Sequence, residues 1–229
     1  MKKSLFFDTG PLISLTLSRL LWILPKLKEH FNGHFYITPA VKRELIERPL
    51  TIKRFSFEAL QALKLIREGV LEVYDEVPQQ KAKELTALAN QSFSAGNKTI
   101  DVMQSGEMES ISSALVEEST LVTDERTLRL FVESPGELQK LLEMRFKKKI
   151  TSDSDSIRSF SQQLKGVPII RSIELVSVAY SLGLLDEYVP EQKKGRDLLV
   201  DSVFWTVKYN GCAVTEQEIE EIKRLLLKK

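Results

Sequence analysis

Short apolar runs alternate with longer segments whose apolar residues recur at helical spacing. The runs cover residues 4–7, 35–38, 70–75 and 120–125. The segments between them, at residues 11–31, 40–48, 55–69, 79–95 and 106–119, predict helices. A fully apolar strand such as the first is typical of a parallel sheet covered on both faces. Strand and helix therefore alternate as in a parallel sheet with helices on both sides.

Proline and glycine predict where several helices begin and end. Pro11 is well placed at the start of the first helical segment, which we expect to continue to residue 31. Pro49 is expected to end the short helix after the second strand. Gly69 is expected to cap the helix that starts at residue 55.

The pattern changes after residue 125. Residues 125–131, 136–150 and 156–164 read as helices around a serine-rich break at 151–156, which we expect to be a loop within an inserted helical hairpin. A further strand is expected at 166–172, where Pro168 restricts it to a sheet edge or to the strand's first residue. Helices are then expected at 173–185, before Asn210, and from Thr215, which forms a capping box with Glu218.

These elements predict an α/β fold. We expect a three-layer α/β/α arrangement with a central parallel sheet of four or five strands, an inserted helical segment and a helical C-terminal tail. The main domain is expected to cover residues 1–185, with 133–165 as the insertion, and residues 186–229 to pack on it as a helical extension.

Composition and cysteine content narrow the class of protein. The chain is 42% hydrophobic and 28% charged, as in ordinary folded domains. The single cysteine, Cys212, allows no intrachain disulfide and suits a reducing compartment. Asp8 and Arg19 interrupt the apolar N-terminal stretch, and no apolar run approaches the roughly 20 residues of a membrane-spanning helix. We therefore expect a cytoplasmic protein without a membrane partner.

Charge is balanced overall but unevenly distributed. Lys and Arg number 33 against 32 Asp and Glu, a net charge of +1. Residues 76–125 hold 9 acidic and 3 basic residues, and the stretches on both sides, 1–75 and 126–149, have an excess of basic residues. An acidic centre between basic stretches fits a metal site beside a phosphate-binding surface, and it fits ordinary solvated helices equally well.

Four acidic residues are expected to meet at one edge of the sheet. Asp8 ends the first strand and Asp124 the fourth, and ligands bind at the carboxyl ends of parallel strands. Glu44 lies on the short helix after the second strand, and Glu107 opens the helix that leads into the fourth. Glu109 is a rival to Glu107, because it faces about 200° round the helix, and Asp101 is a weaker rival.

Crowded carboxylates repel one another unless a cation neutralises them. Oxygen-only ligands suit Mg²⁺ or Mn²⁺. Such a site positions and deprotonates a water molecule and stabilises charge on a phosphoryl oxygen. The acids therefore point to hydrolysis of a phosphodiester bond.

The stretches "LFFDTGPLISL", "ITPAVKRELI", "GEMESISSAL" and "LVTDERTLR", in this order, resemble the acidic motifs of the PIN-domain family. The resemblance covers roughly residues 4–132, with residues 166–185 similar to the family's last strand and helix. It implies a metal-dependent endoribonuclease acting on RNA with Mg²⁺ or Mn²⁺, often a homodimer, and in many members a toxin held by an antitoxin protein. The residues that match the family's four acids, and so would be catalytic and bind metal, are Asp8, Glu44, Glu107 and Asp124.

The sequence departs from the family pattern in three ways. Some members place the final acid two positions after the threonine, which here is Glu125 rather than Asp124. The stretch 133–165 resembles an insertion, and the tail beyond about residue 190 is longer than a minimal member needs.

Each acid also has a purely structural interpretation. Asp8 and Asp124 are good helix caps, Glu107 suits a helix N-terminus, and Glu44 suits a solvated helix surface. An inactive scaffold that binds RNA or protein is therefore the alternative function. A hydrolase of a small phosphorylated substrate is a third hypothesis, which the basic flanks favour less than a polymer substrate.

Overall fold

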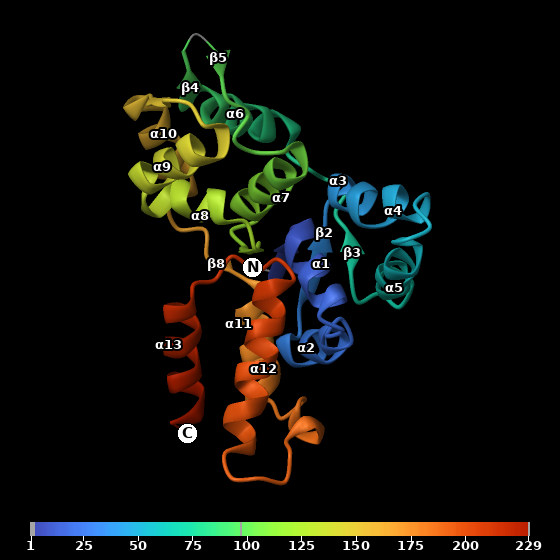
Figure 1. Ribbon diagram of the computed structural model, residues 1–229. Coiled ribbons are helices and arrows are strands. Elements are labelled where there is room, and N and C mark those ends of the chain that lie inside the picture. The colour runs from blue at the N-terminus through green and yellow to red at the C-terminus, as the bar shows by residue number, and fades with distance from the viewer. Residues whose placement is uncertain (1–2, 97, 229) are drawn as a thin grey trace.

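The central sheet consists of five parallel strands in the order β3-β2-β1-β6-β8 (Figure 1). The computed structural model describes residues 3–96 and 98–228. The strands are β1 Ser4–Phe7, β2 His34–Ile37, β3 Glu72–Val73, β6 Thr120–Val122 and β8 Ile169–Ile170. Phe7, the last residue of β1, pairs with Ile37 on one side and Val122 on the other. The predicted parallel sheet is confirmed, and its three central strands end level with one another.

Side chains of β1 alternate between two hydrophobic cores, one on each face of the sheet. Phe7 belongs to a core that includes side chains of α1 Thr9–Leu17, α2 Ile23–Phe31, α5 Ser56–Arg67, α11 Ser172–Ser181, α12 Gly195–Tyr209 and α13 Glu216–Leu227. Phe6 belongs to a second core, with side chains of α6 Gln79–Gln91, α7 Ser105–Val116, α8 Arg126–Glu133, α9 Pro135–Phe146 and α10 Ser154–Leu164. Figure 1 shows α6 to α10 gathered at one end of the molecule and α11 to α13 at the other. The expected three-layer α/β/α architecture is therefore observed.

The first helical segment is broken, so the prediction of one helix over residues 11–31 is wrong. The chain leaves α1 after Leu17 and passes through Arg19, whose φ is +59°. Pro25 is the third residue of α2, in the first turn, where its missing N–H costs no hydrogen bond. A proline at that point of a continuous helix would have removed one.

The segment after β2 stays helical beyond its expected end before Pro49, so that boundary is also wrong. It consists of α3 Pro39–Lys42, the π-helical turn η1 Arg43–Glu47 and α4 Arg48–Leu50. Thr38 caps α3 through its hydroxyl, and the Arg48 N–H reaches the carbonyl of Arg43, five residues back. This wide turn just before Pro49 lets the chain continue in helical form.

A small antiparallel sheet was not predicted. It is formed by β4 Phe93–Ala95, β5 Lys98–Thr99 and β7 Thr151–Ser152, in the order β5-β4-β7. The helix expected over 79–95 therefore ends at Gln91, and the serine-rich break contains a strand, because Ser94 pairs with Thr151.

The tail beyond residue 185 begins with the 3₁₀ turn η2 Asp186–Tyr188 and continues into α12 and α13. Both of these helices pack against α11, which follows β8, the last strand of the sheet. In the part of the chain that the structure describes, no helix has the length and apolar character needed to cross a membrane.

Candidate active site

Asp8 lies at the carboxyl end of β1 and is only 6% exposed. Its Oδ1 accepts a hydrogen bond from the Thr9 N–H at 2.7 Å, and its Oδ2 accepts one from the Thr123 hydroxyl at 3.0 Å. Asp8 is thus the N-cap of α1. The same contacts hold the carboxylate rigidly beside the end of β6.

Glu44 reaches the same edge from the π-helical turn η1. The Thr9 hydroxyl donates to Glu44 Oε2 at 2.9 Å. Thr9, the residue that follows Asp8, therefore contacts Glu44. Gly106, near the start of α7, also approaches Glu44: a Cβ at this glycine would lie 3.1 Å from Glu44 Oε1. The glycine therefore leaves the space that the Glu44 carboxylate occupies.

Glu107 and Glu109 point to different places, as their spacing on α7 requires. Glu107 lies with Asp8, Thr123 and Glu125 around a narrow gap, the acid pocket, which has no room for a water molecule. Glu107 Oε2 accepts from the Gln104 N–H at 2.9 Å. Glu109 Oε2 instead accepts from the Ala40 N–H, at the start of α3, at 3.1 Å. Of this pair, Glu107 is the one beside Asp8.

The carboxylates of Asp124 and Glu125 also point to different places. The Asp124 carboxylate accepts from the Ser172 N–H at 2.8 Å and from the Ser172 hydroxyl at 2.7 and 2.9 Å. The negative charge of Asp124 therefore lies at the N-terminus of α11, where it interacts favourably with the helix dipole. Glu125 lines the pocket with Asp8 and Glu107. Its Oε1 also caps α8 by accepting from the Thr127 N–H at 3.0 Å.

The structure thus brings together Asp8, Glu44 and Glu107 of the four expected acids, and it adds Glu125. Asp124 lies next to this group in the chain, but its carboxylate is directed at α11. Asp101 lies exposed in the loop before α7. Sequence reasoning also missed Ser172 and Gly106. The available signal for Ser172 was its position two residues after β8, at the carboxyl edge of the sheet.

Burial and neighbouring charges raise the pKa of two of the acids. Burial raises the pKa of Asp8 to about 6, against the hydrogen bonds from Thr9 and Thr123, and the charges of Glu44 and Glu125 add to the increase. Burial likewise raises the pKa of Glu107 to about 8, with the charges of Asp8, Glu125 and Glu44 contributing. A cation between these carboxylates would relieve the repulsion.

The donor set fits a hard divalent cation, because all four side chains offer carboxylate oxygens. Their present arrangement is not yet a binding site: among the residues described, no three His, Cys, Asp or Glu side chains are grouped so as to hold an ion. Glu107 gives one reason, since its carboxylate is turned toward the Gln104 N–H. An ion would compete with that amide for the carboxylate.

No protein-family profile, curated protein or solved structure matches this chain. The resemblance to the PIN-domain family therefore rests on the four acidic motifs and on residues 166–185.

Proposed function

We propose that the protein is a metal-dependent endoribonuclease that hydrolyses RNA phosphodiester bonds. The observation that carries the proposal is the cluster of four carboxylates at the carboxyl edge of the sheet, of which Asp8 is buried, and in which the pKa values of Asp8 and Glu107 are raised to about 6 and about 8. Strongly shifted pKa values of this kind cluster at functional sites. The residues that would hold Mg²⁺ or Mn²⁺ are Asp8, Glu44, Glu107 and Glu125, with Glu125 in place of the expected Asp124.

A bound Mg²⁺ or Mn²⁺ would supply an activated water and stabilise charge on the phosphoryl group. The chain's own contribution is to fix the acids. Thr9 joins Asp8 to Glu44 through its backbone N–H and its hydroxyl, and Thr123 holds the other oxygen of Asp8. These contacts keep two carboxylates in place when no cation is bound.

Basic side chains beside the acids support a polyanionic substrate. Arg43 flanks Glu44 on η1 with its side chain 55% exposed, and it lines a surface pocket with Glu44 and Arg48. Arg126 follows Glu125 directly and is exposed. Guanidinium groups at these positions would contact phosphates on either side of the bond that is cut. RNA as the polymer, a homodimer and an antitoxin partner all rest on the family resemblance.

An inactive scaffold is the second candidate function. It is favoured by the arrangement of the acids, because no three of the described side chains are grouped to hold an ion. In that case Asp8 and Glu125 would serve only as the caps of α1 and α8.

The test is cleavage of a panel of single-stranded and structured RNAs with Mn²⁺, with Mg²⁺ and with a chelator. We expect the wild type to cleave only with metal, and Asp8→Asn and Glu107→Gln to lose at least 100-fold in rate. Glu117→Gln is the matched control, because Glu117 is an exposed acid at the other end of α7 and its Oε1 accepts from the Tyr74 hydroxyl rather than contacting the site. Equal cleavage by wild type and Asp8→Asn would contradict the proposed site, and no cleavage of any RNA by either protein would favour the scaffold.

A further inference from the structure

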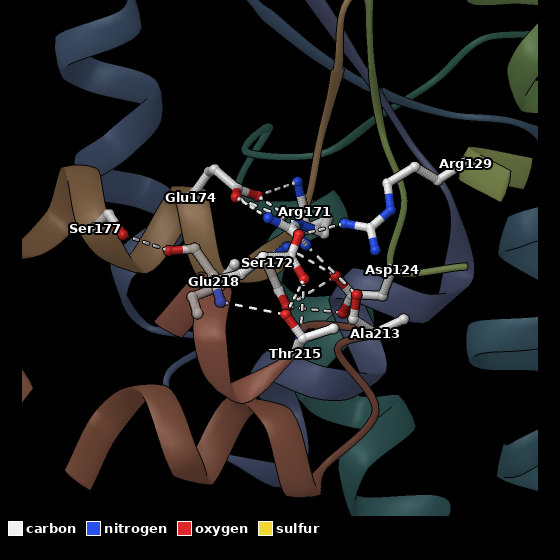
Figure 2. A network of polar contacts seen from close by, with 10 residues as sticks. Asp124, Arg129, Arg171, Ser172, Glu174, Ser177, Ala213, Thr215 and Glu218 are labelled. Carbon is white, nitrogen blue, oxygen red and sulfur yellow. Dashed lines mark hydrogen bonds and ion pairs between the residues drawn. The ribbon is translucent and has the colours of Figure 1, made fainter. Parts of the chain in front are cut away.

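A network of charged side chains connects the C-terminal helix to the edge of the sheet that carries the acids (Figure 2). Arg171 follows β8, and its side chain is 14% exposed. Its Nη2 donates to Glu174 Oε1 at 2.6 Å, and its Nη1 donates to Glu218 Oε1 at 2.8 Å. Glu218 lies on α13, so this pair joins the tail of the chain to the start of α11.

Glu218 connects two helices. Its Oε1 also accepts from Arg129 Nη1 of α8 at 2.6 Å, while its Oε2 accepts from the N–H and the hydroxyl of Thr215, both at 2.8 Å. Although partial burial raises its pKa, the hydrogen bonds from Thr215, Arg171 and Arg129 lower it to about 2. Glu218 is therefore a permanent anion between α8 and α11.

The turn formed by residues 123–125 carries Thr123 and Glu125 and contacts both α8 and α11. Residues 123–125 connect β6 to α8, and α8 begins directly after Glu125. The Asp124 carbonyl accepts from the Ala213 N–H at 3.3 Å, and the Asp124 carboxylate binds Ser172 at the start of α11. The C-terminal segment thus contacts this turn directly through Ala213 and indirectly through both helices that Glu218 joins.

We propose that Glu218 and Arg171 are positioning residues of the candidate active site. By fixing α8 and α11 relative to each other, they set the turn that presents the Thr123 hydroxyl to Asp8 and the Glu125 carboxylate to the acid pocket. This inference rests on the proposed function. Neither residue lines the acid pocket, and the C-terminal extension acts on the site by positioning this turn.

The experiment compares full-length wild type with Glu218→Gln and Arg171→Lys. Glu220→Gln is the matched control, since Glu220 is an exposed acid on the same helix. Arg171→Lys keeps the positive charge but loses the planar fork that binds Glu174 and Glu218 together. It also keeps the test open if Glu218→Gln does not fold. The readouts are amide hydrogen exchange of residues 121–128 and Mn²⁺ affinity by calorimetry.

We expect both variants to show faster exchange confined to residues 121–128 and about tenfold weaker Mn²⁺ binding, as for other residues that orient metal ligands. Glu220→Gln should match the wild type in both readouts. Unchanged exchange in this turn, unchanged Mn²⁺ affinity, or exchange increased throughout the protein would each overturn the inference. Failure of the wild type to bind Mn²⁺ would instead overturn the proposed function, so the two failures are distinguishable.

Discussion

Two features of its surroundings shift the pKa of Asp8 in opposite directions. As the N-cap of α1 it benefits from its negative charge, since it accepts from the Thr9 N–H. As a buried acid near Glu44 and Glu125 it is destabilised by the same charge, and its pKa rises to about 6. A cation bound beside Asp8 would therefore stabilise its ionised form.

Replacing Asp8 by Asn is expected to stabilise the metal-free protein at neutral pH. The folded-state pKa of about 6 lies above the ordinary value of 3.8, so the wild type loses stability as pH rises between these values. The asparagine keeps the shape and has no charge to bury. We expect its advantage in unfolding free energy to widen by roughly 2 kcal/mol between pH 4.5 and pH 7.5.

Urea unfolding of both proteins at the two pH values, in the presence of a chelator, measures this difference. A deficit of the Asp8→Asn variant that is the same at both pH values would show that the charge of Asp8 is not destabilising.

We expect substitution of Asp124 to reduce folding stability and substitution of its neighbour Glu125 to reduce metal binding. Asp124→Ala leaves the N–H and hydroxyl of Ser172 without their acceptor, which costs roughly 1–3 kcal/mol of folding stability. Glu125→Gln keeps an oxygen for the Thr127 N–H but removes a carboxylate from the acid pocket. Urea unfolding and Mn²⁺ calorimetry should separate a stability defect in the first from a binding defect in the second. If Asp124→Ala folds and binds Mn²⁺ more weakly, while Glu125→Gln binds it as the wild type does, Asp124 rather than Glu125 is the ligand.

At the scale of elements, the site depends on the close approach of α7 to η1. Gly106→Ala is expected to displace the Glu44 carboxylate, because the new Cβ would lie 3.1 Å from its Oε1. Alanine is also the better helix residue, so the unfolding temperature should stay the same or rise. We expect RNA cleavage to fall about tenfold, as is typical when a ligand's support is disturbed. Unchanged cleavage by this variant would mean that Glu44 has no part in the chemistry.

Periodicity predicted the elements whose signals are local. The apolar run of β1 and the acid-led start of α7 were found within about a residue of their true bounds. The break between α1 and α2 was missed although Pro25 marked it, because the apolar repeat continues through Leu20 and Leu21, both buried. The pairing of Ser94 with Thr151 joins two- and three-residue strands far apart in sequence, and no local pattern reveals it.

For the whole molecule, the topology predicted where the acids gather but not which ones face inward. Parallel strands place Asp8 and the end of β6 at one edge, as the sequence indicates. The choice of Glu107 over Glu109 depends on the rotation of α7, and the choice of Glu125 over Asp124 depends on how the chain leaves β6. The tail's contribution through Glu218 is equally a property of the assembled fold.

The central claim is that acids from four separate elements share one divalent cation. Crystals soaked in Mn²⁺ and measured at the manganese absorption edge test it most directly. We expect an anomalous peak about 2.1 Å from an oxygen of Asp8 and from an oxygen of Glu107 or Glu125. No peak at this edge of the sheet in millimolar Mn²⁺, or a peak without Asp8 among its ligands, would contradict it.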